Sequence, residues 1–141
     1  MTGTESSGQT EIDVSGNLLD QLRTEARKAH PRECCGLLLG HGSKITAIQP
    51  AANVHATPRT RFAIDPQTLI DAHRAARAGG PQVVGYYHSH PDGPPRPSAT
   101  DREEAAHDGR VWAIAGAGGD VAFWRDDEAG FEPLPLAGGH G

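Results

Sequence analysis

Two histidines and one aspartate lie at spacings that could hold a metal ion. His88 and His90 stand two residues apart where the apolar segment 82–88 ends, and Asp101 follows eleven residues after His90. Side chains two apart on a strand project from the same face, so both imidazoles can converge on one point. Two imidazoles and one carboxylate form a three-ligand set for a divalent metal and leave the fourth position for water, as in catalytic sites. The spacing therefore predicts a metal centre.

Simpler explanations exist for each part of this pattern. A histidine at a strand end is commonly a solvated surface residue, and the chain contains eight histidines. Ser98 to Asp101 also fits a helix N-terminus of the Ser-x-x-Asp type, which needs no function. Taken singly, these explanations are preferable. Taken together, with a loop of four prolines over 91–97 joining the two parts, the spacing favours the metal site.

The elements expected around these residues form one α+β domain. Periodicity and capping residues predict helices over 15–30 and 65–79, the second capped by Asp65, and a short helix over 98–107. Apolar runs predict strands at 11–14, 34–39, 44–48, 61–64, 82–88, 111–115, 121–124 and 131–134. Because strands and helices do not alternate strictly, we expect a mixed sheet packed by two longer helices and one short helix.

Length and charge limit the possible functions. The 141 residues suffice for a single domain, expected over 11–136, with flexible tails at 1–10 and 137–141. Thirteen basic against eighteen acidic residues leave a net charge of −5, which disfavours a nucleic-acid partner. The apolar runs fall far short of the ~20 residues that span a bilayer, so no membrane association is expected. The N-terminus does not resemble a signal peptide.

The two cysteines indicate a reducing compartment. Cys34 and Cys35 are adjacent, and Cα atoms only ~3.8 Å apart do not suit ordinary disulfide geometry. We therefore expect a cytoplasmic protein. A thiol nucleophile or an additional metal ligand is conceivable here, but inside an apolar run these residues are expected to be small buried side chains without a catalytic role.

The residues around the predicted metal site match a known pattern. His88-Ser89-His90, seven residues, Ser98, two residues and Asp101 resemble the JAMM (MPN+, Mov34/PAD-1-like) metallopeptidase motif. The segment 31–40, Pro-Arg-Glu-Cys-Cys-Gly-Leu-Leu-Leu-Gly, is similar to the one that carries the upstream glutamate of that family. The resemblance covers about residues 11–136, with no departure at a motif position. It implies a JAMM/MPN fold of cytidine-deaminase-like architecture with a mixed, curved sheet.

This resemblance implies a zinc-dependent peptidase or isopeptidase. One zinc ion per chain would be held by His88, His90 and Asp101 and would activate water. Glu33 would be the general acid/base, and the Ser98 hydroxyl would donate to the oxyanion. For Glu33 the alternative is a solvated loop carboxylate; for Ser98 it is a helix N-cap. A short chain resembles the bacterial stand-alone branch, whose substrates are ubiquitin-like sulfur carriers of the ThiS/MoaD type cleaved after a C-terminal Gly-Gly.

Two other functions fit parts of the pattern. A non-haem iron oxygenase also uses two histidines and one carboxylate, although its ligands commonly follow a different order along the chain. An MPN domain can also be a binding module, either without catalysis or latent until a partner orders the loop around Glu33. The sequence leaves the physiological substrate and the oligomeric state open.

Overall fold

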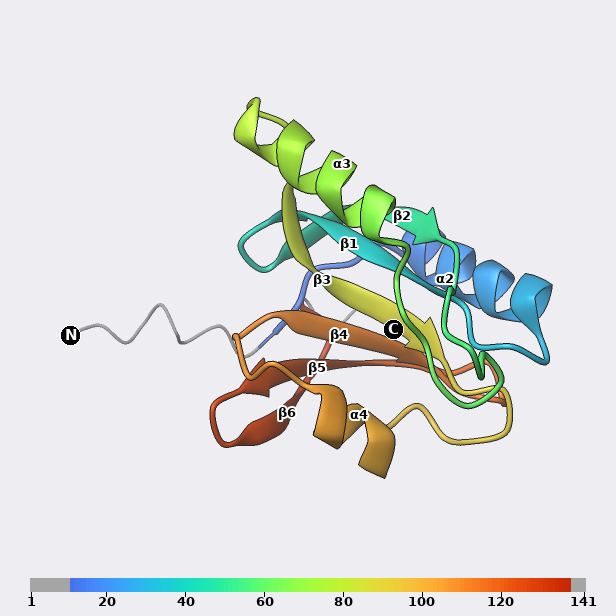
Figure 1. Cartoon of the computed structure of the whole chain (residues 1–141). Coiled ribbons are helices and arrows are strands. Elements are labelled where there is room, and N and C mark those ends of the chain that lie inside the picture. Colours follow the sequence, from blue (N-terminus) through green and yellow to red (C-terminus); the bar gives the residue numbers. More distant parts are fainter. Residues whose placement is uncertain (1–10, 138–141) are drawn as a thin grey trace.

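A computed structural model of the chain describes residues 11–137 (Figure 1). The flexible tails expected at 1–10 and 138–141 lie outside the described residues. Ala137, expected to belong to the C-terminal tail, donates its N–H to the carbonyl of Ile12 at 2.8 Å. The segment before the first helix and the last described residue are thereby joined.

One six-stranded sheet forms the centre of the described fold, in the order β2-β1-β3-β4-β5-β6. The strands β3 and β4 pair in parallel and all other neighbours are antiparallel, which confirms the predicted α+β fold with a mixed sheet. None of the described helices is long and apolar enough to cross a membrane. The elements are α2 (Gly16–Ala29), β1 (Cys35–His41), β2 (Lys44–Ala51), α3 (Pro66–Arg77), β3 (Gln82–Ser89), α4 (Ala99–Glu104), β4 (Val111–Ala115), β5 (Val121–Asp127) and β6 (Gly130–Leu134).

The two faces of the sheet are covered differently (Figure 1). Leu18 and Leu22 of α2 belong to the same buried apolar cluster as Tyr87 of β3. Adjacent residues of a strand point to opposite faces, and Tyr86 lines a cavity together with Leu69 of α3. Thus α2 covers one face with the apolar core, whereas α3 and α4 lie on the opposite face, toward which the side chains of alternate residues such as His88 project.

The strand expected over 61–64 does not form. Only Ile64 makes an isolated bridge, to Asn53. Two backbone bonds join this segment to residues 52–54, from the Val54 N–H to the Ala63 carbonyl and from the Asp65 N–H to the Ala52 carbonyl. Other backbone groups bond to a side chain: Asn53 Nδ2 donates to the Arg61 carbonyl at 3.0 Å, and Asn53 Oδ1 accepts from the Ala63 N–H at 3.1 Å. The short strand expected over 11–14 is likewise reduced to isolated bridges.

Two predicted helix ends differ from the structure. Asp65 precedes α3, but its side chain accepts from the Thr68 hydroxyl at 3.2 Å and caps no backbone N–H. The short helix was expected to reach His107 and ends at Glu104. His107 adopts a left-handed backbone with φ of 58°, and its N–H donates to Asp126 Oδ2 at 2.9 Å. The buried Asp126 carboxylate thus fixes the chain as it leaves α4.

Candidate metal centre

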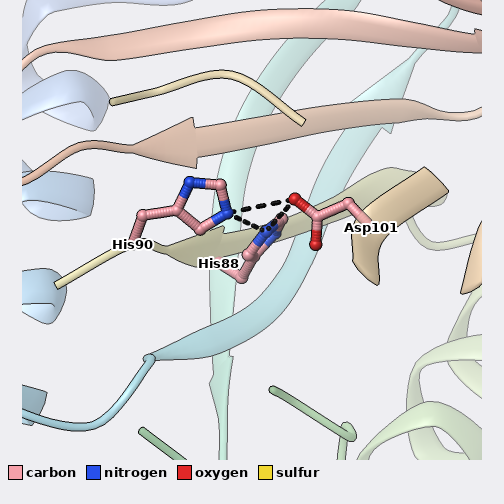
Figure 2. Close-up of side chains that lie close together, drawn as sticks. All are labelled: His88, His90 and Asp101. Atoms are coloured by element: carbon pink, nitrogen blue, oxygen red, sulfur yellow. Dashed lines mark hydrogen bonds and ion pairs between the residues drawn. The ribbon is translucent and has the colours of Figure 1, made fainter. Parts of the chain in front are cut away.

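The three predicted metal ligands converge on one point (Figure 2). Nε2 of His88 lies 3.2 Å from Nε2 of His90. Asp101 Oδ2 lies 3.1 Å from the first of these nitrogens and 3.0 Å from the second. Tetrahedral zinc with bonds of about 2.0–2.1 Å separates its donor atoms by roughly 3.3 Å. The spacing therefore fits a single ion shared by all three side chains.

The hydrogen bond of His90 to the backbone supports a cation at this point. His90 Nδ1 lies 2.8 Å from the carbonyl oxygen of Pro94. A carbonyl only accepts, so Nδ1 carries the proton of the neutral ring and Nε2 presents its lone pair. That lone pair faces a carboxylate oxygen of Asp101 at 3.0 Å. Two acceptors so close require a proton or a cation between them, and a metal ion bound here would be that cation.

Burial keeps His88 in the form that binds metals. Its side chain is fully buried, stacked on Phe62 at a ring-centroid distance of 4.4 Å and met edge-on by Trp112 at 5.5 Å. This burial lowers the pKa of His88 although Asp101 favours the charged ring. The neutral imidazole, with a free lone pair, is the ligand that a metal needs.

Asp101 is oriented by the first turn of α4. Its N–H donates to Ser98 Oγ and its Oδ2 accepts from the Ser98 N–H, both at 3.0 Å. Burial acts to raise the pKa of Asp101, but its interactions with His88 and His90 and the hydrogen bond from the Ser98 N–H outweigh burial and hold that pKa below its usual range. Ser98 is therefore the helix N-cap, as the simpler explanation expected, while its hydroxyl proton stays available for donation.

The proline loop that connects the two halves of the centre rests on β4 and β5. The His90 N–H donates to the carbonyl of Ala115 at 2.8 Å, and Trp124 Nε1 donates to the carbonyl of Pro95 at 3.1 Å. A Cβ on Gly116 would come within 2.8 Å of the Pro95 ring, so only glycine lets the loop pack this closely. The loop thereby holds Asp101 opposite the histidines.

Glu33 is buried beside this centre instead of lying in a solvated loop. Its backbone N–H donates to the Pro58 carbonyl at 2.8 Å, and its own carbonyl accepts from Asn53 Nδ2 at 3.0 Å. The side chain is 6% exposed, and among the described residues its Oε1 has no hydrogen-bond partner. Burial raises the pKa of Glu33 to about 7, with His90 acting to lower it and Asp101 to raise it. The carboxyl group therefore lies within electrostatic range of two predicted ligands.

Ser89, between the two histidines, joins this segment to β3. Its Oγ accepts from the Cys34 N–H at 2.8 Å, and its N–H donates to the Cys34 carbonyl at 3.3 Å. Glu33 is the residue directly before Cys34, so its position depends on β3, the strand that carries His88. This role of Ser89 was not predicted from the sequence. The one feature that could have indicated it is the position of its hydroxyl between two candidate ligands.

The remaining surroundings contain further residues that sequence reasoning missed. Phe62 and Trp112, which contact His88, also line a cavity of about 240 Å³ that reaches Asp101. Tyr86 lines the same cavity on the sheet face that carries His88. An aromatic residue in a loop or strand has no spacing that would single it out. Only the folded chain places these rings around the ligands.

Both cysteines behave as expected of buried side chains. Burial raises the pKa of Cys34 to about 11 and that of Cys35 to about 12. The Sγ of Cys35 lies 3.6 Å from the carbonyl of Ala52, a weak hydrogen bond that occupies the thiol. Neither group is a ready nucleophile at neutral pH.

Comparisons with known proteins agree with this geometry. Residues 15–127 match the family described as prokaryotic homologs of the JAB domain. A desampylase of Haloferax volcanii is 37% identical over 129 residues, covering 89% of this chain and 91% of the relative. A probable TtuB-protein conjugate cleaving protease of Thermus thermophilus is 36% identical, covering 78% and 73% respectively. A solved JAB1/MPN domain protein from Archaeoglobus fulgidus, 21% identical, matches the fold with a TM-score of 0.60 over 91% of this chain and 99% of its own.

Proposed function

The chain belongs to the prokaryotic JAB-domain family of JAMM/MPN proteins, and we propose that it cleaves the amide bond after the C-terminal Gly-Gly of a ubiquitin-like or sulfur-carrier protein. Its similarity to a desampylase and to a TtuB-conjugate cleaving protease makes it a hydrolase of ubiquitin-like conjugates. The observation that carries the proposal is the convergence of His88, His90 and Asp101 within hydrogen-bond distance, with the buried Glu33 beside them.

Family membership separates the alternatives that the sequence left open. Similarity to a desampylase and to a conjugate-cleaving protease argues against an iron oxygenase and against a binding module without catalysis. A latent enzyme would need a displaced Glu33 loop, yet here Glu33 is held by Pro58 and Asn53, and its neighbour by Ser89. These bonds support an enzyme whose acid/base is already in place.

We assign the metal ligands to His88, His90 and Asp101, and the metal to a single zinc ion. The nitrogen and oxygen donors suit Zn²⁺, and three protein ligands leave one position for water or substrate. When bound, zinc supplies Lewis-acid activation of water and of the scissile carbonyl. Pro94 fixes the tautomer of His90 and Ser98 orients Asp101, so hydrogen bonds define the direction of two of the three donors.

In this mechanism Glu33 transfers the proton. Its unpartnered Oε1 accepts a proton from the attacking water, and the same carboxyl then donates it to the leaving amine. A pKa of about 7 suits both steps, because the group gains and loses its proton readily at neutral pH. The Ser98 hydroxyl, whose oxygen caps α4, donates a hydrogen bond to the oxyanion that forms at the scissile carbonyl.

Three further assignments complete the proposal. The substrate is a ThiS/MoaD-type carrier or its conjugate. The catalytic unit is the single domain 11–136, which contains every assigned residue. The two free, buried cysteines support a location in the cytoplasm, where thiols stay reduced.

The direct test combines metal analysis with cleavage of a ThiS/MoaD-type carrier extended past its Gly-Gly by a reporter peptide. We expect about one zinc per chain and release of the peptide by the wild-type protein. His88→Ala should lose zinc and cleavage together. Glu33→Gln should keep zinc and lose nearly all turnover. Iron in place of zinc, or full turnover in Glu33→Gln, would contradict the proposal.

A further inference from the structure

Arginines line three adjoining hollows, two of which reach His90 of the predicted metal centre. The first hollow is lined by His30, Arg32 and Arg59. A second shares His30 with the first and extends to His90. A third shares His90 with the second and extends along the proline loop to Ser98. Among residues 11–137, no aspartate or glutamate lines any of the three. Their arginines, named here the arginine rim, are Arg23, Arg27, Arg32, Arg59, Arg96 and Arg102.

Most of the arginine rim carries uncompensated charge. Arg23 pairs with Asp20 at 2.9 Å, whereas the other five rim arginines make no ion pair within residues 11–137. All five are exposed. Outside the rim, Arg61 lies 3.8 Å from Glu104 across the mouth of the apolar cavity, and Arg110 lies 2.9 Å from Asp108. Arg74 and Arg77 of α3 make no ion pair within residues 11–137, but they line none of the three hollows. The positive charge therefore concentrates on the flanks that lead to His90.

This concentration opposes the charge of the molecule as a whole. The chain carries a net charge of −5, so an acidic protein would be repelled by most of its surface. The arginine rim would attract it, and two of the three hollows reach His90 of the predicted metal centre. Complementary charge of this kind orients a partner and speeds its encounter. A nucleic acid, negative along its whole length, would instead meet repulsion beyond the rim.

We propose that the arginine rim binds an acidic surface next to the C-terminal tail of the ubiquitin-like substrate, so that the tail enters the metal centre. This inference rests on the proposed function and specifies its partner: the carrier must be acidic around the tail. The rim orients the substrate and takes no part in bond cleavage. Its removal therefore raises KM and leaves kcat unchanged.

The test compares matched losses of two positive charges. Two rim variants and one control on α3 each change two exposed arginines to glutamine: R32Q/R59Q, R96Q/R102Q and, as the control, R74Q/R77Q. The probe is a ThiS/MoaD-type carrier with acidic residues beside its tail, extended past Gly-Gly by a reporter peptide. A second form of the carrier has those acids changed to amides. Binding is titrated with each charge variant on a Glu33→Gln background, and cleavage is measured with Glu33 intact.

We expect each rim variant to weaken binding of the acidic carrier about tenfold at low salt, and less at high salt because surface charges are then screened. The control should bind like the parent, and the amide form of the carrier should not distinguish the variants. KM should rise in parallel with unchanged kcat. Equal binding by rim variants and control would overturn the inference.

Three further outcomes are decisive. Tighter binding of a 20-nucleotide DNA than of the acidic carrier would assign the rim to nucleic acid and overturn the inference. Rim-dependent binding without cleavage by the wild-type protein would support the rim and contradict the proposed function. Cleavage with the same KM by the rim variants and the wild-type protein would support the proposed function and contradict the role of the rim.

Discussion

The first turn of α4 and the segment before β1 each bury one carboxylate at the same centre, and the pKa values of the two carboxylates shift in opposite directions. Asp101 Oδ2 lies 3.1 Å and 3.0 Å from the two imidazole nitrogens and accepts from a backbone N–H, and the pKa of Asp101 falls below its usual range. Glu33 keeps an oxygen without a partner among the described residues, and burial raises its pKa to about 7. Burial acts on both in the same direction, so the polar partners of each carboxylate decide the difference.

This difference separates two tasks. A permanently ionised carboxylate holds a cation, and a carboxyl group that titrates near neutrality moves a proton. The local structure explains why each residue has its own task. A helix N-terminus offers backbone N–H groups to Asp101, whereas the backbone around Glu33 is already bonded to Pro58 and Asn53. Within residues 11–137, no hydrogen-bond donor reaches Oε1 of the Glu33 side chain.

The largest expected effect comes from neutralising the ionised partner. Asp101→Asn keeps an oxygen that can accept from the Ser98 N–H but removes the negative charge that a metal requires. We expect zinc affinity to fall by more than about 100-fold, since even residues that only orient ligands contribute 10–100-fold. Competition with a chelating dye measures this affinity. Glu33→Gln makes the same replacement of a carboxyl group by an amide and should retain zinc. Equal losses of zinc affinity in the two variants would contradict the separate roles of Asp101 and Glu33.

A smaller effect is expected where the two tasks meet, at Ser98. Ser98→Ala removes both the N-cap and the hydroxyl donor, which should cost about 1 kcal/mol of stability and about 10²–10³ in kcat. Ser98→Gly is the matched control, because glycine caps a helix with a loss of only a few tenths of a kcal/mol. Denaturant unfolding and steady-state kinetics separate the two roles. If Ser98→Gly recovers the rate together with the stability, Ser98 is a cap alone.

The smallest expected effect is a pH dependence of stability in the chelator-treated protein. The pKa of Glu33 lies near 7 in the folded chain and near 4.5 when unfolded, so between these values the folded state holds more protons. Stability must therefore fall as pH rises from 4.5 through 7, by at most about 3 kcal/mol from this group. Glu33→Gln should match the parent below pH 4.5 and exceed it at pH 8 in urea unfolding. A constant difference would place Glu33 in a solvated site.

Much of this architecture was predictable because its signals are local. The spacing of His88, His90 and Asp101 depends only on strand alternation and one helix start, and the structure brings all three together. The failed strand over 61–64 shows the limit. Its pattern suits a strand, but the side chain of Asn53, eight residues before Arg61, takes two of the hydrogen bonds that a neighbouring strand would use.

The environment of Glu33 was equally beyond sequence reasoning. A carboxylate in a polar loop ordinarily faces water, and only the packed chain shows that it is buried without a donor. The rings of Phe62 and Trp112 around His88 belong to the same class of information. Residue type and spacing predict which groups can act, and tertiary packing sets their electrostatic state.

The bond pair between Cys34 and Ser89 has a consequence for how activity is acquired during folding. The three proposed metal ligands fall within residues 88–101, at the start of the crossover between the parallel strands, whereas the Cys34–Ser89 contact closes a span of 55 residues. Closing this span has an entropic cost and depends on the completed sheet. In a chain opened at this contact the proposed ligands would stay close along the sequence while Glu33 left its place beside them, so metal content alone would overestimate the active fraction of a preparation.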